Sequence, residues 1–399
     1  MNVLLLTQVL PYPPDSGPKI KTWNVLKYLA RRHQVTLVSF VRGDQSTEVA
    51  HLRRYCSSVH TVPMKRSALL DGLAMLRSLL RGQPWMMVRD DRIAMRQLID
   101  RLAAETRFDV AHADQLNMAQ YAARVAGARK ILDAHNALWL LYQRLAATMS
   151  PGLRKWLLDR DWRLLKDYEG RMCREFDAVL AVSTEDRLAL EKAMAGSREI
   201  AVIPIAVDTD ELTPVARCPN ASHILHIGTM YWPPNIDAVQ WFVDQVYPLI
   251  RAKRPEVVFD VVGARPPQAV LNLNDRGIGI NVTGYVKDPL TYLQQTGAMV
   301  VPVRAGGGMR VKILEALAQS LPLVTTTLGC EGIAVEDGQQ VLIADTPADF
   351  AGAVLRLLED RSFADELGRR GRELVAARYD YRVACGPLDL VYQSGGRLA

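Results

Sequence analysis

Cysteine is scarce in this sequence of 399 residues, and its spacing argues against two kinds of site. The cysteines are odd in number, and the closest two stand 45 positions apart; they are Cys56, Cys173, Cys218, Cys330 and Cys385. Disulfide frameworks and thiolate metal sites need closer or paired spacings. The seven histidines show no His-x-x-x-His or His-Glu-x-x-His spacing. We therefore expect no protein-bound metal and no cofactor.

Long apolar runs are missing too. No run approaches the roughly 18 residues that a membrane-spanning helix needs. The first eight residues are apolar, but they have no basic leader and no small-residue cleavage site, so they indicate a buried strand and not a signal peptide. We expect a cytoplasmic protein, and the chain is long enough for two domains.

Charge is distributed unevenly along the chain. Residues 1–171 contain 27 Lys and Arg against 15 Asp and Glu, a net charge of +12, whereas residues 172–399 contain 22 against 28, or −6. The basic half is where an anionic partner is expected. Its basic residues lack interleaved aromatics, and no nucleic-acid motif occurs, so no nucleic-acid partner is expected. An anionic membrane surface or a phosphate-bearing acceptor fits the charge.

A leucine stripe lies within residues 65–81. Leu69, Leu73, Leu76 and Leu80 follow one another at spacings of four, three and four. The basic residues beside them are Lys65, Arg66, Arg77 and Arg81. The spacing predicts an amphipathic basic helix, either facing the core, which is the more common arrangement, or docking on a membrane.

The chain as a whole has an α/β pattern. Short aliphatic runs alternate with longer helical periods, which is typical of β-α-β units and parallel sheets. Strands are expected at residues 3–6, 35–40, 59–62, 110–112, 131–133 and 178–182, and again at 224–227, 257–262, 280–283, 299–303, 323–326 and 341–344. Each set is sufficient for its own doubly wound sheet.

The segment between the two sets predicts the domain organisation. It contains Pro204, Pro214 and Pro219 and has little periodicity. We expect an N-terminal Rossmann-like domain at 1–203, a linker at 204–222 and a C-terminal Rossmann-like domain at 223–378. The last segment, 379–399, is a helix with no strand to follow and is a candidate to cross back to the first domain. Ligands bind at the carboxyl ends of parallel strands, so the loops of both domains are expected to face a central cleft.

The residues at 300–317 carry the strongest chemical signal. A buried strand is followed by Gly306, Gly307 and Gly308, which let the backbone approach a ligand, and a helix is expected to begin near Met309. The free amides of a helix N-terminus attract anions. Arg310 and Lys312 place positive charge in the first turn, where it opposes the helix dipole and is unfavourable unless an anion is near. The segment predicts a diphosphate site.

Glu315 follows Lys312 by three residues and lies on nearly the same helical face. Its carboxylate could accept hydrogen bonds from both ribose hydroxyls of a nucleotide whose phosphates lie on the glycine loop. The alternative is a surface Lys-Glu pair after a flexible loop, which would leave the glycines without a purpose.

Residues 306–316, followed by 321–326 and 329–333, resemble the donor site of the retaining family-four glycosyltransferases. Further similar segments are 227–228, 232–235, 262–263, 284–288 and 182–186, in family order along nearly the whole chain. The resemblance implies the GT-B fold of two Rossmann-like domains. It also implies a nucleotide-diphosphate sugar as donor and transfer with retention, without a metal.

The resemblance assigns roles to single residues, with some departures. Glu315 matches the second glutamate of the Glu-x7-Glu motif, which binds the ribose, whereas Gly307 stands where the first glutamate is expected. Gly228 ends the first strand of the C-terminal domain, but the Arg and Lys that usually follow are absent. Arg310 and Lys312 are expected to replace them. The segment 284–288 implies base-binding roles for Tyr285, Val286 and Asp288.

Three residues of the N-terminal domain are candidates for the reacting centre. Gly17 ends a proline-rich loop directly after the first strand and is either a backbone contact to the reacting centre or an ordinary turn glycine. His135 follows a strand and resembles the family histidine that reaches the donor sugar; its alternative is a structural role. Asp133 would point to the same side as His135, where it could orient the imidazole or bind the acceptor. Ser183 is expected to cap a helix, with Glu185 and Asp186 as a structural acidic first turn.

The predicted function is therefore a retaining, metal-independent hexosyltransferase of cell-surface polysaccharide synthesis. Its acceptor is expected to be a glycan or a lipid-linked intermediate, with peripheral contact to the inner face of the cytoplasmic membrane. Two alternatives remain open: an enzyme similar to the sugar-nucleotide 2-epimerases, and a non-catalytic donor-binding subunit of a glycan assembly complex.

Overall fold

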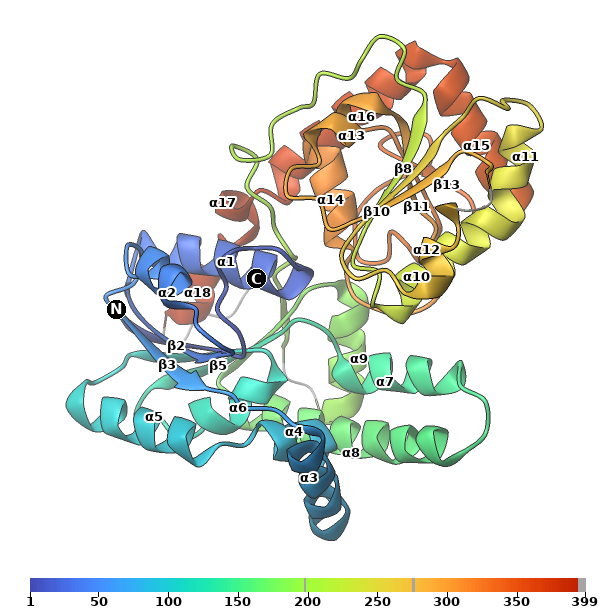
Figure 1. Cartoon of the computed structure of the whole chain (residues 1–399). Helices are drawn as coiled ribbons and strands as arrows, with labels where there is room; N and C mark the ends of the chain where they lie inside the picture. The colour runs from blue at the N-terminus through green and yellow to red at the C-terminus, as the bar shows by residue number, and fades with distance from the viewer. Residues whose placement is uncertain (197–198, 275–276, 394–399) are drawn as a thin grey trace. The chain divides into compact units, whose positions relative to one another are not determined.

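The computed structural model describes residues 1–196, 199–274 and 277–393. The chain forms two compact units. Unit 1 comprises Met1–Ala206 together with the chain from Ala384, and unit 2 comprises Val207–Val383. In each unit, helices cover both faces of a parallel sheet (Figure 1).

Unit 1 is built on a seven-stranded sheet with the order β3-β2-β1-β4-β5-β6-β7. Val3 of β1 pairs with Val35 of β2 on one side and with Val110 of β4 on the other. The strands are β1 (Asn2–Thr7), β2 (Gln34–Val41), β3 (Ser58–Pro63), β4 (Val110–Asp114), β5 (Arg129–Ala134), β6 (Ala178–Ala181) and β7 (Ala201–Val202). All six predicted strands are confirmed. Strand β7 was missed because two residues carry no periodicity.

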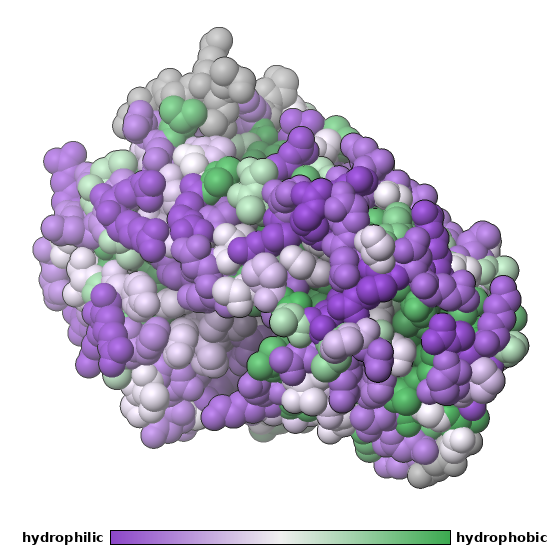
Figure 2. Space-filling view, turned by 90° about the horizontal axis from the view of Figure 1, so that it is seen from above, coloured by the Kyte–Doolittle hydropathy of each residue, from purple (hydrophilic) through white to green (hydrophobic). Residues whose placement is uncertain are grey.

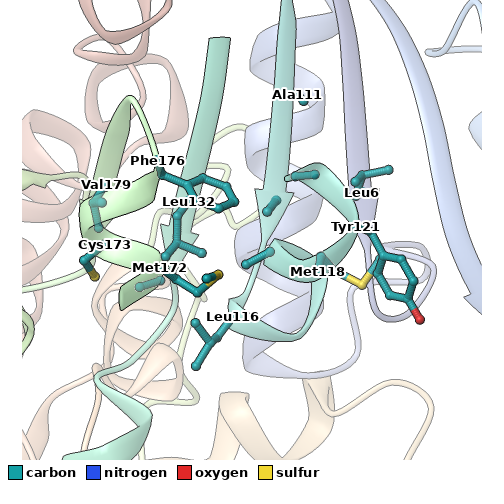
Figure 3. Close-up of a cluster of buried hydrophobic side chains, with 14 of the residues drawn as sticks. Leu6, Ala111, Leu116, Met118, Tyr121, Leu132, Met172, Cys173, Phe176 and Val179 are labelled. Atoms are coloured by element: carbon teal, nitrogen blue, oxygen red, sulfur yellow. The ribbon is translucent and has the colours of Figure 1, made fainter. Parts of the chain in front are cut away.

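The helices of unit 1 surround this sheet. They are α1 (Gly17–Ala30), α2 (Ser46–Leu52), α3 (Ala68–Arg81), α4 (Trp85–Asp90), α5 (Ile93–Glu105), α6 (Leu116–Ala122), α7 (Leu138–Ala147), α8 (Leu153–Glu175), α9 (Thr184–Met194) and α18 (Leu388–Tyr392). Figure 3 shows part of the core, where Leu132 of β5 lies among Met172 and Phe176 from the end of α8. Helix α9 begins after Ser183, whose Oγ accepts a hydrogen bond from the Asp186 amide, so the predicted cap is confirmed.

The C-terminal segment packs into unit 1 through polar contacts of α18. The Tyr392 hydroxyl lies 2.6 Å from His112 Nδ1, and the Tyr28 hydroxyl donates to Asp389 at 2.8 Å. Arg129 Nε donates to the carbonyl of Val391. The end of the predicted 379–399 segment, residues 394–399, lies outside the described residues.

Unit 2 has a six-stranded sheet with the order β10-β9-β8-β11-β12-β13. The strands are β8 (His223–Ile227), β9 (Phe259–Val262), β10 (Ile280–Gly284), β11 (Thr296–Val301), β12 (Leu323–Thr325) and β13 (Leu342–Ile343). The helices are α10 (Pro233–Trp241), which continues as a π-helix (Phe242–Val246), then α11 (Tyr247–Arg251), α12 (Gln268–Leu271), α13 (Leu290–Gln295), α14 (Val311–Ala318), α15 (Pro347–Glu359), α16 (Arg361–Arg378) and α17 (Tyr381–Ala384). The six predicted strands are again confirmed, although β11 begins three residues earlier than expected.

The strand order of each sheet indicates the edge at which a ligand is expected to bind. Both sheets wind outward in two directions from their first strand, so the topological switch falls between β1 and β4 in unit 1 and between β8 and β11 in unit 2. Ligands of doubly wound sheets bind beyond the carboxyl ends of the strands at such a switch. The predicted glycine loop follows β11, and Gly17 follows β1.

The surface shows where one prediction was wrong. The face drawn in Figure 2 is largely hydrophilic, with small apolar areas between the polar residues. In unit 1, however, Leu69, Leu73, Leu76 and Leu80 of α3 are exposed, so the core-facing interpretation of the leucine stripe does not hold. No helix of the described residues is long and apolar enough to cross a membrane.

Candidate active site

The glycine loop of unit 2 joins β11 to α14. Gly306 and Gly308 have φ values of 106° and 78°, which glycine adopts without the strain that a side chain would add. Helix α14 begins at Val311, with Arg310 as its N-cap, which is two residues after Met309 and close to the predicted start. The difference arises because Gly308 and Arg310 both have non-helical backbone angles, so the first turn cannot form earlier.

Lys312 extends from α14 to the end of β8. Its Nζ donates a hydrogen bond of 3.0 Å to Oδ1 of Asn235, and Nδ2 of Asn235 donates to the carbonyl of Thr229 at 2.9 Å. A Cβ placed on Gly228 would lie 2.5 Å from Nζ of Lys312. Any side chain at position 228 would therefore displace the ammonium, which explains why glycine ends this strand.

Arg310 folds back over the glycine loop. Its guanidinium donates to the carbonyl of Gly307 at 2.6 Å and approaches the carbonyl of Ala305 at 3.5 Å. The side chain thus braces the loop. Its predicted contact with a diphosphate stays a prediction.

Two ionisable groups of α14 have strongly shifted pKa values. Burial and the neighbouring Arg310 lower the pKa of Lys312 to about 7, although Glu315 opposes the shift. Burial raises the pKa of the Glu315 carboxyl to about 7, against the attraction of Lys312. Glu315 accepts no side-chain hydrogen bond within the described part of the chain. Both groups would return to their charged forms if a ligand supplied a phosphate to one and hydroxyls to the other.

His226 lies beneath Lys312 in β8 and was not predicted. Its Nδ1 donates to the carbonyl of Val300 at 2.9 Å, while its Nε2 has no hydrogen-bond partner among the described residues. Burial and the charge of Lys312 hold the pKa of this imidazole well below its usual value. A neutral ring adds no further positive charge beneath the ammonium.

The predicted base-binding residues follow β10, two strands from β8. Tyr285 and Asp288 are exposed and Val286 is half-buried; Oδ1 of Asp288 accepts the Leu290 amide. Two exposed aromatic residues that were not predicted, Tyr231 and Trp232, lie in the loop after β8. Nothing in their local sequence separates them from ordinary surface aromatics.

The candidate residues of unit 1 centre on a buried ion pair. Lys21 of α1 donates to Oδ1 of Asp133 at the end of β5, and both side chains are almost wholly buried. Burial alone would raise the pKa of Asp133, but Lys21, with smaller contributions from His112 and His135, lowers it. His112 Nε2 lies 3.6 Å from the same carboxylate. Asp133 therefore balances the charge of Lys21.

The partner of His135 is Asp114 and not Asp133. Nε2 of His135 lies 2.9 Å from Oδ1 of Asp114, which also accepts a hydrogen bond from the Thr22 hydroxyl. The side-chain Nε2 of Gln115 lies 3.3 Å from Nδ1 of the same ring. Asp114 was missed because the predicted strand ended at residue 112. Two more strand residues would have placed this carboxylate at the same sheet edge as His135.

Gln115 has a backbone conformation that side chains rarely adopt, with φ 74° and ψ 156°. This region is essentially restricted to glycine and costs about 1–3 kcal/mol for other residues. Strain of this kind persists where the surrounding structure requires it, and here it accompanies the contact between Gln115 and His135.

Asp114, Asp133 and His135 form a group that could ligate a metal, because their ligand atoms all lie within 4.8 Å of one another. Histidine spacing in the sequence did not reveal it, since the three residues come from two strands. Lys21 already supplies a cation to Asp133, and Thr22 already bonds Asp114. The group is held together by these contacts.

Two buried carboxylates fix the helix that follows His135. Glu169 of α8 accepts the amides of Leu138 and Trp139 at 3.1 Å each, and Asp186 accepts the Ala137 amide at 2.8 Å. Burial, with a contribution from Asp186, raises the pKa of Glu169 to about 8. Gly17, the remaining candidate, is the first residue of α1, and Lys21 follows it about one turn later in the same helix.

The structure brings some of the predicted residues together with residues that were not predicted, in two groups. One is the lysine cluster of unit 2, which we define as Gly228, Asn235, Gly306, Arg310 and Lys312. The other is the histidine cluster of unit 1, defined as Lys21, Asp114, Gln115, Asp133 and His135. Each group lies at the carboxyl ends of its strands, as the topology requires.

Two family models match the chain. The model described as glycosyltransferase family 4 matches residues 20–211, and the model described as glycosyl transferases group 1 matches residues 221–360. An uncharacterised 44.6 kDa protein from the cps region of Klebsiella pneumoniae is 20% identical over 95% of this chain and 96% of its own length. Glycogen synthase of Mycobacterium tuberculosis is 24% identical over 68% of this chain and 69% of its length.

Solved structures share the fold. Anabaena HepE, in a complex with UDP and glucose, has a TM-score of 0.67 at 14% identity, with 98% of each chain covered. Sucrose-phosphate synthase of Thermosynechococcus elongatus has a TM-score of 0.72 at 16% identity, again over 98% of each chain. Because the two models match the two halves of the chain in order, the protein belongs to the group 1 and family 4 glycosyltransferases and has the GT-B fold.

Proposed function

We propose that this glycosyltransferase takes a sugar from a nucleoside diphosphate donor and transfers it with retention, without a metal ion. The observation that carries the proposal is the position of Lys312, whose ammonium lies over Gly228 and donates a hydrogen bond to Asn235. In the family pattern, basic residues after the first strand supply this charge. Here the cation reaches the same strand end from α14.

The leaving group would be stabilised by charge that the protein itself supplies. Lys312, Arg310 and the N-terminal amides of α14 surround the predicted phosphate position, and preorganised charge of this kind usually lowers the barrier more than any other single effect. Glu315, one turn further along α14, would accept the ribose hydroxyls, and Tyr285, Val286 and Asp288 would contact the base. Burial shifts the pKa values of Lys312 and Glu315 toward their neutral forms, and a bound phosphate and ribose would favour the charged forms again.

The route to retention that we favour is a same-face transfer, in which the departing phosphate assists deprotonation of the acceptor. A double-displacement mechanism would need an unengaged carboxylate as nucleophile. Asp133 and Asp114 are buried, and both already accept hydrogen bonds, from Lys21 and Thr22 respectively. We assign His135, held by Asp114, to the donor sugar and Gly17 to a backbone contact near the reacting centre.

The acceptor that we propose is a glycan or lipid-linked intermediate of cell-surface polysaccharide synthesis. The Klebsiella relative from a cps region supports this assignment. The net charge of +12 in residues 1–171 favours an acceptor that carries phosphate, presented at the inner face of the cytoplasmic membrane.

The first experiment is a donor screen by thermal unfolding with UDP-, GDP- and dTDP-sugars. A donor at 100 times its dissociation constant should stabilise the folded protein by about 2.7 kcal/mol. Glu315→Ala should reduce that stabilisation, because the ribose loses a charged acceptor that contributes about 1.5–3 kcal/mol. The matched control is Glu359→Ala, which removes an exposed carboxylate at the end of α15, outside the segments that resemble the donor site. No stabilisation by any sugar nucleotide would contradict the proposal.

A second measurement separates the alternatives. Nucleotide release that depends on an added acceptor indicates transfer, whereas release from the donor alone indicates an epimerase-like or hydrolytic reaction. Binding without any release indicates a donor-binding subunit. Proton NMR of the product reports the anomeric configuration and hence retention.

A further inference from the structure

Helix α3 lies on unit 1 with its leucine side facing the solvent. Leu69 and Leu80 are 74% and 78% exposed, Leu73, Leu76 and Leu79 are also exposed, and only Ala74 and Ser78 of the helix are buried. Figure 1 shows α3 projecting from the body of unit 1. Soluble monomers rarely expose so many apolar side chains on one element unless the surface binds something.

The orientation follows from helix geometry. At about 100° per residue, Leu69, Leu73, Leu76 and Leu80 fall within one narrow stripe, and Ala74 and Ser78 lie roughly 130–170° away from its centre. The small residues therefore face the protein and the large apolar residues face away. This arrangement is the reverse of an ordinary amphipathic surface helix.

Hydrogen bonds hold α3 in this orientation. Arg160 of α8 donates to the carbonyl and the hydroxyl of Ser78 at 2.7 and 3.2 Å. The Trp85 indole of α4 donates to the carbonyl of Asp71 at 3.2 Å. The inward side is thus fixed at two points, half a helix apart, and the leucines stay outward.

Helix α8 adds apolar surface beside this contact. Leu153 and Trp156 precede Arg160 by seven and four residues, so they lie on the same face of α8 that reaches α3. Both side chains are exposed, at 72% and 56%. Tryptophan is enriched where proteins enter the interface of a bilayer.

The charges around the leucine stripe of α3 favour an anionic membrane as its partner. Arg77 and Arg81 are exposed on its flank, Lys65 and Arg66 precede the helix, and Asp71 is its one acidic residue. Arg77 and Arg81 form no ion pair with any residue that the structure describes. Two copies of this face would bring like charges together, whereas a bilayer with anionic headgroups complements both the leucines and the arginines.

We propose that α3 inserts its leucine face into the headgroup and acyl boundary of an anionic bilayer, with Leu153 and Trp156 as a second contact. The inference extends the proposed function by naming the element that meets the membrane, and it does not depend on the chemistry of the donor. Insertion of this kind anchors unit 1 through side chains, so it persists in part at salt concentrations that remove electrostatic attraction.

The test is flotation of the full chain with phosphatidylcholine vesicles that contain or lack phosphatidylglycerol. We expect binding to the anionic vesicles. Replacing Leu69, Leu73 and Leu80 by serine should weaken it about tenfold or more. The control replaces three exposed leucines outside α3 and α8, Leu188, Leu249 and Leu290, by serine, and this variant should bind within about twofold of the parent. The double variant Arg77→Gln and Arg81→Gln should show a weaker dependence of vesicle binding on salt concentration.

Other outcomes would overturn the proposal. One is equal vesicle binding by the parent and the Leu69, Leu73 and Leu80 variant, and another is equal binding to vesicles with and without anionic lipid. A dimer in sedimentation that the same leucine substitutions dissociate would assign the face to a second copy of the chain. Donor-dependent thermal stabilisation, measured on the same variant, shows that it is folded and separates this failure from a failure of the proposed function.

Discussion

Nζ of Lys312 lies 3.0 Å from Oδ1 of Asn235, which brings a cation from α14 to the carboxyl end of β8. The cation needs Gly228 beneath it and Asn235 beside it. Three residues from one loop and two helices thus combine into one positively charged position at the switch between β8 and β11.

Lys312→Met should weaken binding of the intact sugar nucleotide much more than binding of the free nucleoside. A hydrogen-bonded charge contact contributes about 1.5–3 kcal/mol, and the nucleoside has no phosphate with which to form it. Isothermal titration with both ligands measures the difference. Asn235→Ala serves as the graded comparison, since it leaves the ammonium in place but removes its positioning hydrogen bond. Equal losses for nucleoside and sugar nucleotide would mean that Lys312 supports the fold alone.

Donor affinity should follow a bell-shaped pH profile with its maximum near pH 7. Lys312, with its pKa lowered to about 7, is charged below that pH and loses its charge above it, so affinity falls on the alkaline side. Glu315, with its pKa raised to about 7, becomes protonated below that pH, so affinity falls on the acid side. Lys312→Arg should remove the alkaline limb and Glu315→Gln the acid limb. An intact sugar nucleotide is the right probe because its diphosphate diester does not titrate in this range. A flat profile in the parent protein would contradict the prediction.

Turnover should be the same in excess EDTA as in magnesium, because Lys312, Arg310 and the α14 amides supply the positive charge at the phosphates. The measurement is initial rate at saturating donor with chelator, magnesium or manganese. Activity lost in EDTA and restored by metal would overturn the metal-free mechanism. Asp114, Asp133 and His135 would then be the first residues to examine, since their ligand atoms lie together.

Lys21→Met should destabilise unit 1 by about 3–5 kcal/mol, because it leaves the Asp133 carboxylate buried without its cation. Asp133 is fully buried, so water cannot take the place of the ammonium. Urea unfolding of the parent and the variant gives the difference. The double variant Lys21→Met with Asp133→Asn should recover most of the stability, since it removes both charges. No recovery would mean that lost packing of the lysine stem is the cause.

Gln115→Gly should yield a more stable protein than Gln115→Ala, by about 1–2 kcal/mol, because only glycine adopts φ 74° and ψ 156° without strain. At an unstrained position the order is the reverse. Both variants lose the amide contact with His135, so transfer should fall in both. Thermal unfolding and initial rates on the same preparations check the two statements. Equal stability of the two variants would mean that backbone strain at position 115 does not affect the stability of the protein.

The sequence alone determined the parallel α/β architecture, the glycine loop and the class of enzyme, a glycosyltransferase. Apolar runs such as residues 3–6 and 224–227 are local signals, since a strand buried on both faces is apolar throughout. The spacing of Gly306, Lys312 and Glu315 is also local, because all lie within one loop and the first turns of one helix. These features could be predicted because neighbours in sequence are there neighbours in space.

Only the tertiary structure decided which side chains meet and which way a helix faces. Lys21 and Asp133 are 112 residues apart, and Asp114 reaches His135 only because β4 and β5 are adjacent strands in the sheet. The leucine stripe of α3 predicts an apolar face but not its direction, because periodicity is the same whether the face meets the core or the solvent. Arg160, 82 residues from Ser78, fixes that direction by holding the opposite side of the helix against the protein.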